Sequence, residues 1–307
     1  MDNYRFDGRV AVVTGAGRGI GRAYALLLAA RGAAVVVNDL GGTREGDGSD
    51  GQPAAAVAGE IIDAGGRAIA DTSDVSQVAG GRALIDGAVD EFGRIDIVVN
   101  NAGNIRWAGL PEADAENLGS HLAVHVGGSF NTIRAAWPHM VAQRYGRVVM
   151  TTSTGMFGLP DNLGYATAKA AVIGMTRSLT VAGRPHDITI NLIAPNAWTR
   201  MAQSSDEPGE PRRPAPPHME PELVAPMVAY LAHERCSAAG EIYVAGAGRF
   251  ARIFIASTEG YVHPRTETPT IEDVAAHWAA INDETAYYLP ADLIDWSKHY
   301  LAHQPLP

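Results

Sequence analysis

A tyrosine and a lysine four residues apart, Tyr165 and Lys169, could together carry out acid–base chemistry. Positions i and i+4 of a helix share one face, so the phenol and the ammonium can point into the same site. A phenol titrates near pH 10, and acting as a base near neutrality requires about 4 kcal/mol of preference for the phenolate, which a neighbouring cation partly supplies. The same spacing also occurs on solvated helices, so other parts of the chain must decide between the two interpretations.

A glycine-rich turn, Thr14 to Gly21, lies early in the chain between an apolar run and an amphipathic stretch. Its glycines have the spacing Gly-x3-Gly-x-Gly, from Gly15 through Gly19 to Gly21, with Gly17 between the first two. Between a strand and a helix, such glycines let the backbone approach a pyrophosphate, and the helix N-terminus supplies N–H donors. The turn therefore predicts dinucleotide binding, and the alternative is a tight turn without a ligand.

An acidic residue, Asp39, ends the second apolar run, where it would bind the hydroxyls of an adenosine ribose. A 2'-phosphate at that position would meet like charge at a cost of roughly 4 kcal/mol at close range. Arg18, inside the turn, favours the opposite preference because a guanidinium can bind a 2'-phosphate. We give Asp39 the greater weight, so the expected cofactor is NAD.

Short apolar runs alternate with helical patterns along the chain. This alternation predicts an α/β fold with a single Rossmann-type, doubly wound parallel sheet of six or seven strands. The expected strands are residues 9–14, 34–39, 67–70, 95–100, 147–150, 188–193 and 241–245.

Three segments depart from this alternation. Residues 40–52 are rich in glycine and aspartate, and we expect them to be mobile unless ligand contacts order them. Residues 203–221 are rich in proline and charge, which is typical of a lid over a substrate pocket or of a solvated loop. Residues 1–248 are expected to form the dinucleotide-binding domain. Residues 249–307 are expected to form a mostly helical extension that packs on the core or on a neighbouring subunit, with Thr270 to Asp273 as a helix-capping signal.

Composition and charge exclude several classes of protein. The chain has 307 residues, 46% of them hydrophobic, which is enough for a large core. Its net charge of -10 argues against nucleic acid as a partner, and no Cys, His or carboxylate cluster indicates a metal site. No apolar run is long enough for a membrane span, and the N-terminus lacks the apolar core of a secretory signal. Because Cys236 is the only cysteine, a reducing compartment is expected, with the cytoplasm as the default.

The motifs, taken in order, resemble those of the short-chain dehydrogenase/reductase family. The matching segments are Thr14 to Gly21, Asp74-Val75, Asn100-Asn101-Ala102-Gly103 and Tyr165 to Lys169. The resemblance implies an oxidoreductase with these cofactor-binding residues: Gly15, Gly17, Arg18, Gly19, Ile20, Gly21, Asp39, Asp74, Val75, Asn101, Ala102, Gly103, Tyr165, Lys169 and Pro195.

The same resemblance implies roles for the catalytic residues. Tyr165 would take the hydroxyl proton of the substrate, and Lys169 would lower the pKa of Tyr165 and hold the nicotinamide ribose. A hydroxyl should donate to the substrate oxygen. The usual spacing before the tyrosine gives Thr152, whereas counting forward from the preceding strand gives Ser153, which we prefer.

Two histidines precede the active-site helix. His125 stands where many family members have an asparagine that supports a proton relay, so it could serve in that relay or be an ordinary buried histidine. His121, one turn earlier, is expected on the helix surface.

Further matches, among them Ala194-Pro195-Asn196-Ala197, resemble the dehydrogenase unit of type 2 peroxisomal multifunctional enzymes. That likeness implies NAD-dependent oxidation of a (3R)-3-hydroxyacyl-CoA, including those with bulky or steroid-derived acyl groups, by a homodimer or homotetramer. Two alternatives stay open. One is a dehydrogenase of a free hydroxysteroid or another secondary alcohol, and the other is a non-catalytic dinucleotide-binding scaffold.

Overall fold

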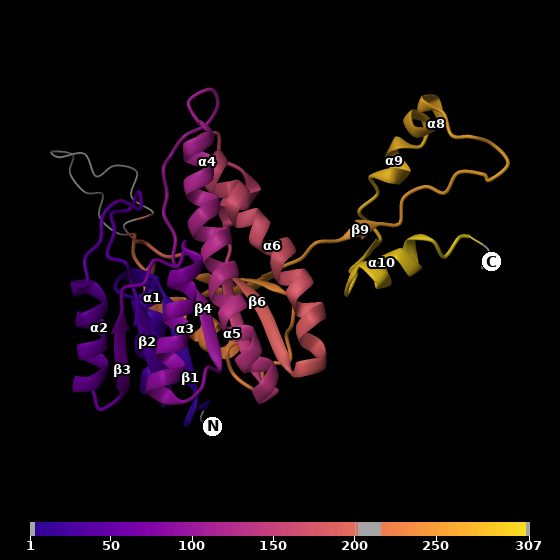
Figure 1. Cartoon of the computed structure of the whole chain (residues 1–307). Coiled ribbons are helices and arrows are strands. Elements are labelled where there is room, and N and C mark those ends of the chain that lie inside the picture. Colours follow the sequence, from indigo (N-terminus) through magenta and orange to yellow (C-terminus); the bar gives the residue numbers. More distant parts are fainter. Residues whose placement is uncertain (1–3, 200, 202–215, 305–307) are drawn as a thin grey trace. The chain divides into compact units, whose positions relative to one another are not determined.

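The apolar runs become the strands of an eight-stranded sheet in the first of two compact units, residues 1–252 (Figure 1). The computed structural model describes residues 4–199, 201 and 216–304. The strands cross the sheet in the order β3-β2-β1-β4-β5-β6-β7-β8, and β1 to β7 pair in parallel. Their bounds are β1 (Val10–Thr14), β2 (Ala34–Asn38), β3 (Arg67–Asp71), β4 (Ile97–Asn100), β5 (Gly146–Thr151), β6 (Ile188–Pro195), β7 (Ile242–Gly246) and β8 (Arg249–Ile253). The predicted Rossmann-type α/β fold is confirmed.

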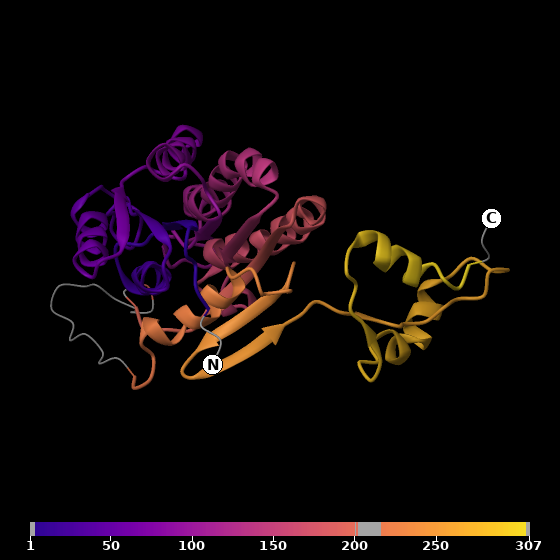
Figure 2. The ribbon, with the colours of Figure 1, turned by 90° about the horizontal axis from the view of Figure 1, so that it is seen from below.

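Helices cover both faces of the sheet, as the view from below shows (Figure 2). On one face, α1 contacts α2 and α7, and elsewhere α3 contacts α5 and α4 contacts α6. Every residue of β1, β2 and β4 is buried, as expected for strands covered on both faces. The helices are α1 (Gly19–Ala30), α2 (Gln52–Asp63), α3 (Val78–Phe92), α4 (Ala115–His121), the π-helix η1 (Leu122–Gly128), α5 (Ser129–Gln143), α6 (Leu163–Gly183), α7 (Ala225–Leu231) and the 3-10 turns η2 (Thr154–Phe157), η3 (Arg184–His186) and η5 (Pro221–Leu223).

The eighth strand, β8, is one more than the expected upper number. Its residues, RFARI, contain no continuous apolar run, because β8 lies at the edge of the sheet and its residues are exposed or half-buried. Ala247 and Gly248, both with positive φ, form the turn that joins it to β7. Positive φ at both central residues matches a two-residue hairpin turn. β8 therefore extends the sheet into residues expected to belong to the extension.

The second unit comprises residues 253–307. It contains β9 (Ser257–Thr258), α8 (Ile271–Ala276), α9 (Trp278–Ile281), β10 (Tyr287–Tyr288) and α10 (Leu293–Tyr300). The predicted capping signal is present, because Thr270 and Asp273 form a reciprocal capping box at the start of α8. None of the described residues 254–304 is buried. Of the predicted lid at residues 203–221, only the last six residues fall within the described part of the chain.

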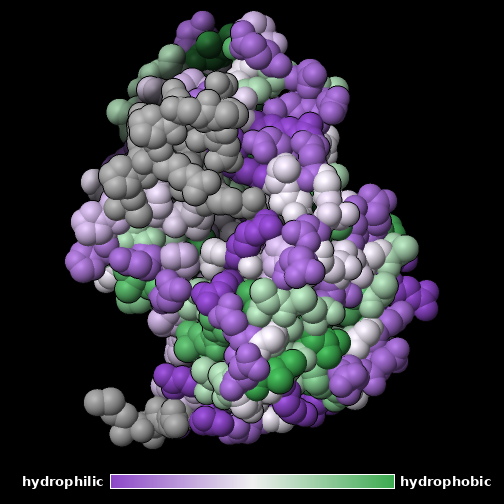
Figure 3. All heavy atoms as spheres, turned by 90° about the vertical axis from the view of Figure 1, so that its left-hand side faces the viewer, coloured by the Kyte–Doolittle hydropathy of each residue, from purple (hydrophilic) through white to green (hydrophobic). Residues whose placement is uncertain are grey.

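The side of the molecule that carries α2 and the edge strand β3 is mainly hydrophilic, with apolar side chains gathered in its lower half (Figure 3). β3 begins with Arg67 and ends with Asp71, and charges at the ends of an exposed strand discourage pairing with another chain. Among the described residues, no helix is long and apolar enough to cross a membrane.

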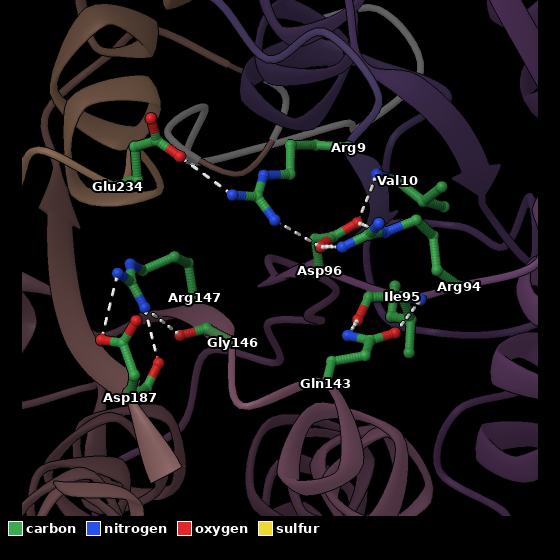
Figure 4. Close-up of polar contacts among 10 residues, drawn as sticks. All are labelled: Arg9, Val10, Arg94, Ile95, Asp96, Gln143, Gly146, Arg147, Asp187 and Glu234. Atoms are coloured by element: carbon green, nitrogen blue, oxygen red, sulfur yellow. Dashed lines mark hydrogen bonds and ion pairs between the residues drawn. The ribbon is translucent and has the colours of Figure 1, made fainter.

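A buried carboxylate, Asp96, joins the N-terminal ends of β1 and β4 (Figure 4). It accepts hydrogen bonds from the backbone N–H of Val10 at 2.9 Å, from Arg94 at 2.6 and 2.7 Å, and from Arg9 at 3.1 Å. Arg9 also donates to Glu234, beyond α7, at 2.9 Å. A buried carboxylate needs such partners, because an unpaired charge in the interior costs several kcal/mol.

The ring of Tyr145 lies between two guanidinium groups at the same end of the sheet. The Cζ atoms of Arg9 and Arg147 are 3.7 and 4.3 Å from its centroid. Arg147 also donates to the backbone oxygen of Asp187 at 2.7 Å, just before β6 (Figure 4). The network thus connects β1, β4, β5 and β6 at the edge opposite their carboxyl ends.

We expect Arg9→Met to lower the free energy of unfolding by about 2 kcal/mol. The substitution removes one cation from a buried carboxylate and one cation–π contact, although Arg94 still pairs with Asp96. Urea denaturation followed by circular dichroism measures the change. Arg22→Met is the matched control, because its ion pair with Glu60 is largely exposed and is worth less than about 1 kcal/mol. Equal losses in the two variants would contradict a stabilising role for the network.

Candidate active site

The glycine turn lies where β1 leads into α1, and Gly15 and Gly21 in it leave no room for side chains. A Cβ atom on Gly15, which has a φ of +63°, would lie 2.9 Å from the Cα of Ala102, and one on Gly21 would lie 2.2 Å from the Gly15 carbonyl oxygen. α1 begins at Gly19, and its first turn has no capping side chain and no acidic residue. Its free N–H groups and helix dipole therefore favour an anion at this point.

A groove runs along the carboxyl ends of β1, β2 and β4, where parallel sheets bind their ligands. Most of the predicted cofactor residues line it. They are Gly15, Arg18, Gly19, Ile20, Gly21, Asp39, Asp74, Val75, Asn101, Ala102 and Gly103. Gly17 instead packs against Asp39, and Pro195 ends β6 without lining the groove. Tyr165 and Lys169, also predicted to bind the cofactor, are not among the residues that line it.

Sequence reasoning missed part of the groove wall. Leu40, Gly42, Thr43 and Gly46 line the groove directly after Asp39, and Asn104 lines it after the Asn-Asn-Ala-Gly motif. Their position beside predicted cofactor residues was the available signal. The loop lacked any periodicity from which its path could be inferred.

The carboxylate of Asp39 is held in a fixed orientation by two backbone N–H groups. Its Oδ2 accepts from Gly17 at 2.8 Å and its Oδ1 from Gly41 at 2.7 Å. Arg18 also lines the groove and donates to the carbonyl oxygen of Gly42 at 3.5 Å. The negative charge of Asp39 thus sits at the groove, where a ribose hydroxyl could reach it.

Asn101 fixes the glycine turn against the end of β4. Its side-chain nitrogen donates to the carbonyl oxygens of Thr14 and Gly15 at 3.0 and 3.1 Å. The hydroxyl of Thr14 accepts the backbone N–H groups of Asn101 and Ala102, both at 3.0 Å. The Asn-Asn-Ala-Gly motif therefore holds the shape of the turn as well as lining the groove.

Tyr165 and Lys169 lie on the first turns of α6, next to the end of β5. The Lys169 Nζ is 5.6 Å from the Tyr165 ring centroid and donates to the carbonyl oxygen of Thr151 at 2.9 Å. Lys169 is 3% exposed. Burial lowers its pKa to about 7, because a charged ammonium loses its hydration there.

Two opposing effects act on the pKa of the Tyr165 phenol. Burial raises its pKa above the ordinary value, and a hydrogen bond with the Ser153 hydroxyl acts in the opposite direction. The hydrogen bond favours the phenolate, as a base requires, whereas burial favours the neutral phenol.

Ser153 and Thr152 have different partners. The Thr152 hydroxyl is fully buried and donates to the backbone oxygen of Lys169 at 2.7 Å, so it stabilises the helix position. Ser153 is the N-cap of the η2 turn, where its Oγ accepts the N–H of Gly155 at 3.0 Å and bonds to Tyr165. This geometry supports Ser153 as the hydroxyl that would face a substrate.

His125 lies beside the tyrosine, 2% exposed, with ring centroids 5.3 Å apart and an edge-on orientation. Its Nε2 donates to the carbonyl oxygen of Asn104 at 2.9 Å, which leaves Nδ1 as an acceptor without a partner among the described residues. Burial, and next the charge of Lys169, hold the pKa of His125 well below its usual range, so the imidazole is neutral. Its part in a proton relay stays a prediction.

His121 is fully buried, and its expected place on the helix surface is wrong. Its ring stacks on His125 and meets Tyr165 edge-on, each with centroids 6.1 Å apart. The Nδ1 donates to Asn117 at 2.7 Å, while Nε2 accepts the N–H of Arg106 at 3.1 Å, so the ring is fixed as one neutral tautomer. The spacing of four residues from His125 was the signal, since both must share a face.

Within the described ranges, no three His, Cys, Asp or Glu side chains form a group that could hold a metal ion. The chemistry available here is that of a hydroxyl, a phenol and a lysine beside a dinucleotide groove.

The family model for short chain dehydrogenases matches residues 9–209. The chain belongs to the short-chain dehydrogenase/reductase family. It is therefore an oxidoreductase that acts on CH–OH groups and takes a nicotinamide dinucleotide as cofactor.

Two relatives are similar to this short-chain dehydrogenase over three quarters or more of its length. The peroxisomal multifunctional enzyme type 2 of Mus musculus is 42% identical over 91% of this chain, which spans only 37% of that enzyme. The (2S)-[(R)-hydroxy(phenyl)methyl]succinyl-CoA dehydrogenase subunit BbsD of Thauera aromatica is 32% identical over 75% of this chain and 90% of its own length.

Two solved structures share the fold. The full-length peroxisomal multifunctional enzyme type 2 from Drosophila melanogaster has a TM-score of 0.79 at 32% identity, covering 97% of this chain and 49% of that one. A 7α-hydroxysteroid dehydrogenase complexed with NADH and 7-oxo glycochenodeoxycholic acid has a TM-score of 0.68 at 27% identity, covering 80% of this chain and 96% of that one.

Proposed function

We propose that the chain oxidises the hydroxyl group of a 3-hydroxyacyl-CoA, with NAD as the hydride acceptor. The arrangement of Ser153, Tyr165 and Lys169 carries this proposal. Tyr165 packs against His125, whose ring lies against Gly103 in the groove wall. The dinucleotide, when bound, supplies the ring that takes up the hydride. Tyr165 takes the hydroxyl proton, and the C–H electron pair leaves as hydride while the C–O bond becomes a carbonyl. The Ser153 hydroxyl donates to the substrate oxygen, and Lys169 offers N–H donors to the cofactor ribose.

The acyl-CoA part of the proposal rests on the relatives and on the surface beside the catalytic groups. The Thauera relative is by name a dehydrogenase of a CoA thioester. Two segments next to Tyr165, residues 107–110 and 157–163, pair at Ala108 and Asn162. They expose large apolar side chains to solvent, namely Trp107, Leu110, Phe157, Leu159 and Leu163. Such a surface suits a long or bulky acyl group.

A free secondary alcohol is the second candidate substrate. The likeness to a hydroxysteroid dehydrogenase structure favours it, and the same apolar surface could take a sterol. The two candidates differ in charge, because only the CoA adduct carries phosphates and should bind less tightly as salt rises.

The deciding experiment measures NAD reduction at 340 nm with a panel of 3-hydroxyacyl-CoAs and free hydroxysteroids. Turnover of the CoA thioesters, with a KM that rises with salt, supports the proposal. If only the free alcohols are oxidised, the acyl-CoA substrate is wrong, and the chain is still a dehydrogenase. Absence of turnover with every substrate and with both dinucleotides would favour a non-catalytic scaffold.

The preference for NAD rests on Asp39. We expect Asp39→Ala to raise the ratio of kcat/KM for NADP to that for NAD about 10- to 100-fold, because a carboxylate at the groove repels a 2'-phosphate and can accept from ribose hydroxyls. Steady-state kinetics with both cofactors measure the ratio. Asp63→Ala, at the exposed end of α2, serves as the control for the general loss of a negative charge. A wild-type enzyme that prefers NADP would overturn the assignment.

We also propose a homodimer or homotetramer in which residues 253–307 pack on a surface outside that unit. The unit buries none of its described residues 254–304, and it exposes Ile271, Trp278, Leu293 and Ile294. A unit of this size without a buried core is not stable by itself. We expect light scattering to give the mass of a dimer or tetramer, and a monomeric mass would contradict the proposal.

A further inference from the structure

The loop that follows Asp39, residues 40–51, forms one wall of the dinucleotide groove. Leu40, Gly42, Thr43 and Gly46 face the groove on the same side as Asp39. Within the loop, the N–H of Asp50 donates to the Leu40 carbonyl oxygen at 2.9 Å, and that of Thr43 to the Asp47 oxygen at 2.8 Å. The N–H of Gly46 also donates to the Thr43 carbonyl oxygen at 3.2 Å, and that of Asp47 to the Thr43 hydroxyl at 3.1 Å. These bonds close turns within the loop but do not attach the wall to the rest of the protein.

The loop is fixed from outside by the segment 104–106, which follows β4. The N–H of Ile105 donates to the Arg44 carbonyl oxygen at 3.0 Å, and the Asn104 side chain to the Glu45 oxygen at 3.3 Å. Arg106 makes two further bonds to the loop. Its Nε donates to the Glu45 oxygen at 3.0 Å and its Nη2 to the Asp47 carboxylate at 2.9 Å.

Arg106 is itself held on the catalytic side of the groove. Its backbone N–H donates to His121 at 3.1 Å, and its backbone oxygen accepts from the Asn117 side chain at 2.9 Å. Its Nη1 donates to Glu116 at 3.3 Å, on the first turn of α4. The guanidinium thus reaches the loop from a backbone fixed against α4, and its planar fork suits several acceptors at once.

We propose that Arg106 is a positioning residue that pins the loop 40–51 in its groove-forming arrangement and thereby sets the affinity for the adenosine half of the dinucleotide. The inference rests on the proposed NAD-dependent function. When the wall is already in place, the cofactor does not have to order the loop as it binds. Less binding free energy is then lost to the ordering of the loop, and the affinity is higher. Because the side chain of Arg106 does not line the groove, its loss acts through the loop and leaves the catalytic groups in position.

The test measures NAD binding by calorimetry and steady-state kinetics for Arg106→Met in the full chain. We expect Kd and KM for NAD to rise about tenfold, with kcat changed by less than about twofold. Inhibition by AMP, which contains only the adenosine half, should weaken by the same factor. The isolated nicotinamide mononucleotide should bind as it does to the wild type.

Neighbouring variants separate the loop contact from other effects. Asp47→Ala removes a loop acceptor and should weaken NAD in the same direction, whereas Glu116→Gln alters the contact that does not involve the loop and should leave Kd within about twofold. The Arg106→Met/Asp47→Ala double variant should lose less than the product of the two single losses, because both remove the same bond. Arg106→Lys should restore part of the affinity, since an ammonium retains the charge but not the fork.

The outcomes distinguish this inference from the proposed function. If the wild type binds NAD and Arg106→Met binds NAD and AMP equally well, the positioning role is wrong and the proposed function stands. If kcat falls along with affinity, Arg106 acts on the catalytic groups and the inference fails in its stated form. A wild type that binds neither NAD nor NADP overturns both.

Discussion

Tyr165→Phe is expected to lower kcat for alcohol oxidation by about 100- to 10,000-fold, the range that a positioned acid–base group contributes. The substitution removes one oxygen atom, the only group on that ring able to take the hydroxyl proton. Ring packing against His121 and His125 survives, since both contacts involve the aromatic face or edge. The affinity for the dinucleotide should therefore change little, and calorimetry with NAD checks this separately from turnover.

A second tyrosine provides the matched control. Tyr24, in α1, is 1% exposed, and its hydroxyl has no partner among the described residues. Tyr24→Phe removes the same oxygen atom from a buried ring outside the groove, so we expect turnover within about twofold of the wild type. Equal rates for the wild type and Tyr165→Phe would refute the proposed role of the phenol.

Lys169→Met is expected to raise the free energy of unfolding at pH 6 to 7 while abolishing efficient turnover. Burial lowers the pKa of Lys169 from 10.5 to about 7. At about 1.4 kcal/mol for each pH unit between the two values, the folded protein loses roughly 5 kcal/mol of stability by holding this charge in its interior. The lost hydrogen bond to Thr151 offsets about 1 kcal/mol of the gain.

The direction with pH follows from proton binding. Between pH 7 and 10.5 the unfolded chain binds a proton at Lys169 that the folded chain has released, so the stability of the wild type rises with pH across this window. The advantage of Lys169→Met should therefore be largest below pH 7 and disappear above about pH 10.5. Urea denaturation at several pH values measures it. The exposed Lys298→Met is the control, and the same gain in both variants would contradict a burial cost.

Local patterns predicted the fold because the central strands are continuous apolar runs and each chemical motif is contiguous. The run VAVVT became β1, and the tyrosine and lysine were assigned to one helix face by spacing alone. The edge strand β8 was missed because it has a neighbouring strand, β7, on one side only. Its side chains are therefore little buried and need not be apolar. Hydrophobic periodicity in a sequence indicates which residues are buried, and an edge strand buries few.

The sequence by itself determined the family, the dinucleotide turn with Asp39, and the pair Tyr165 and Lys169, since each depends on residues close together in the chain. Only the tertiary structure decided what surrounds them. It gave Ser153 and Thr152 different hydrogen-bond partners, buried His121 against the tyrosine, and joined the loop 40–51 to Arg106. These contacts connect segments far apart in sequence, and their geometry depends on how strands and helices pack, which no local spacing encodes.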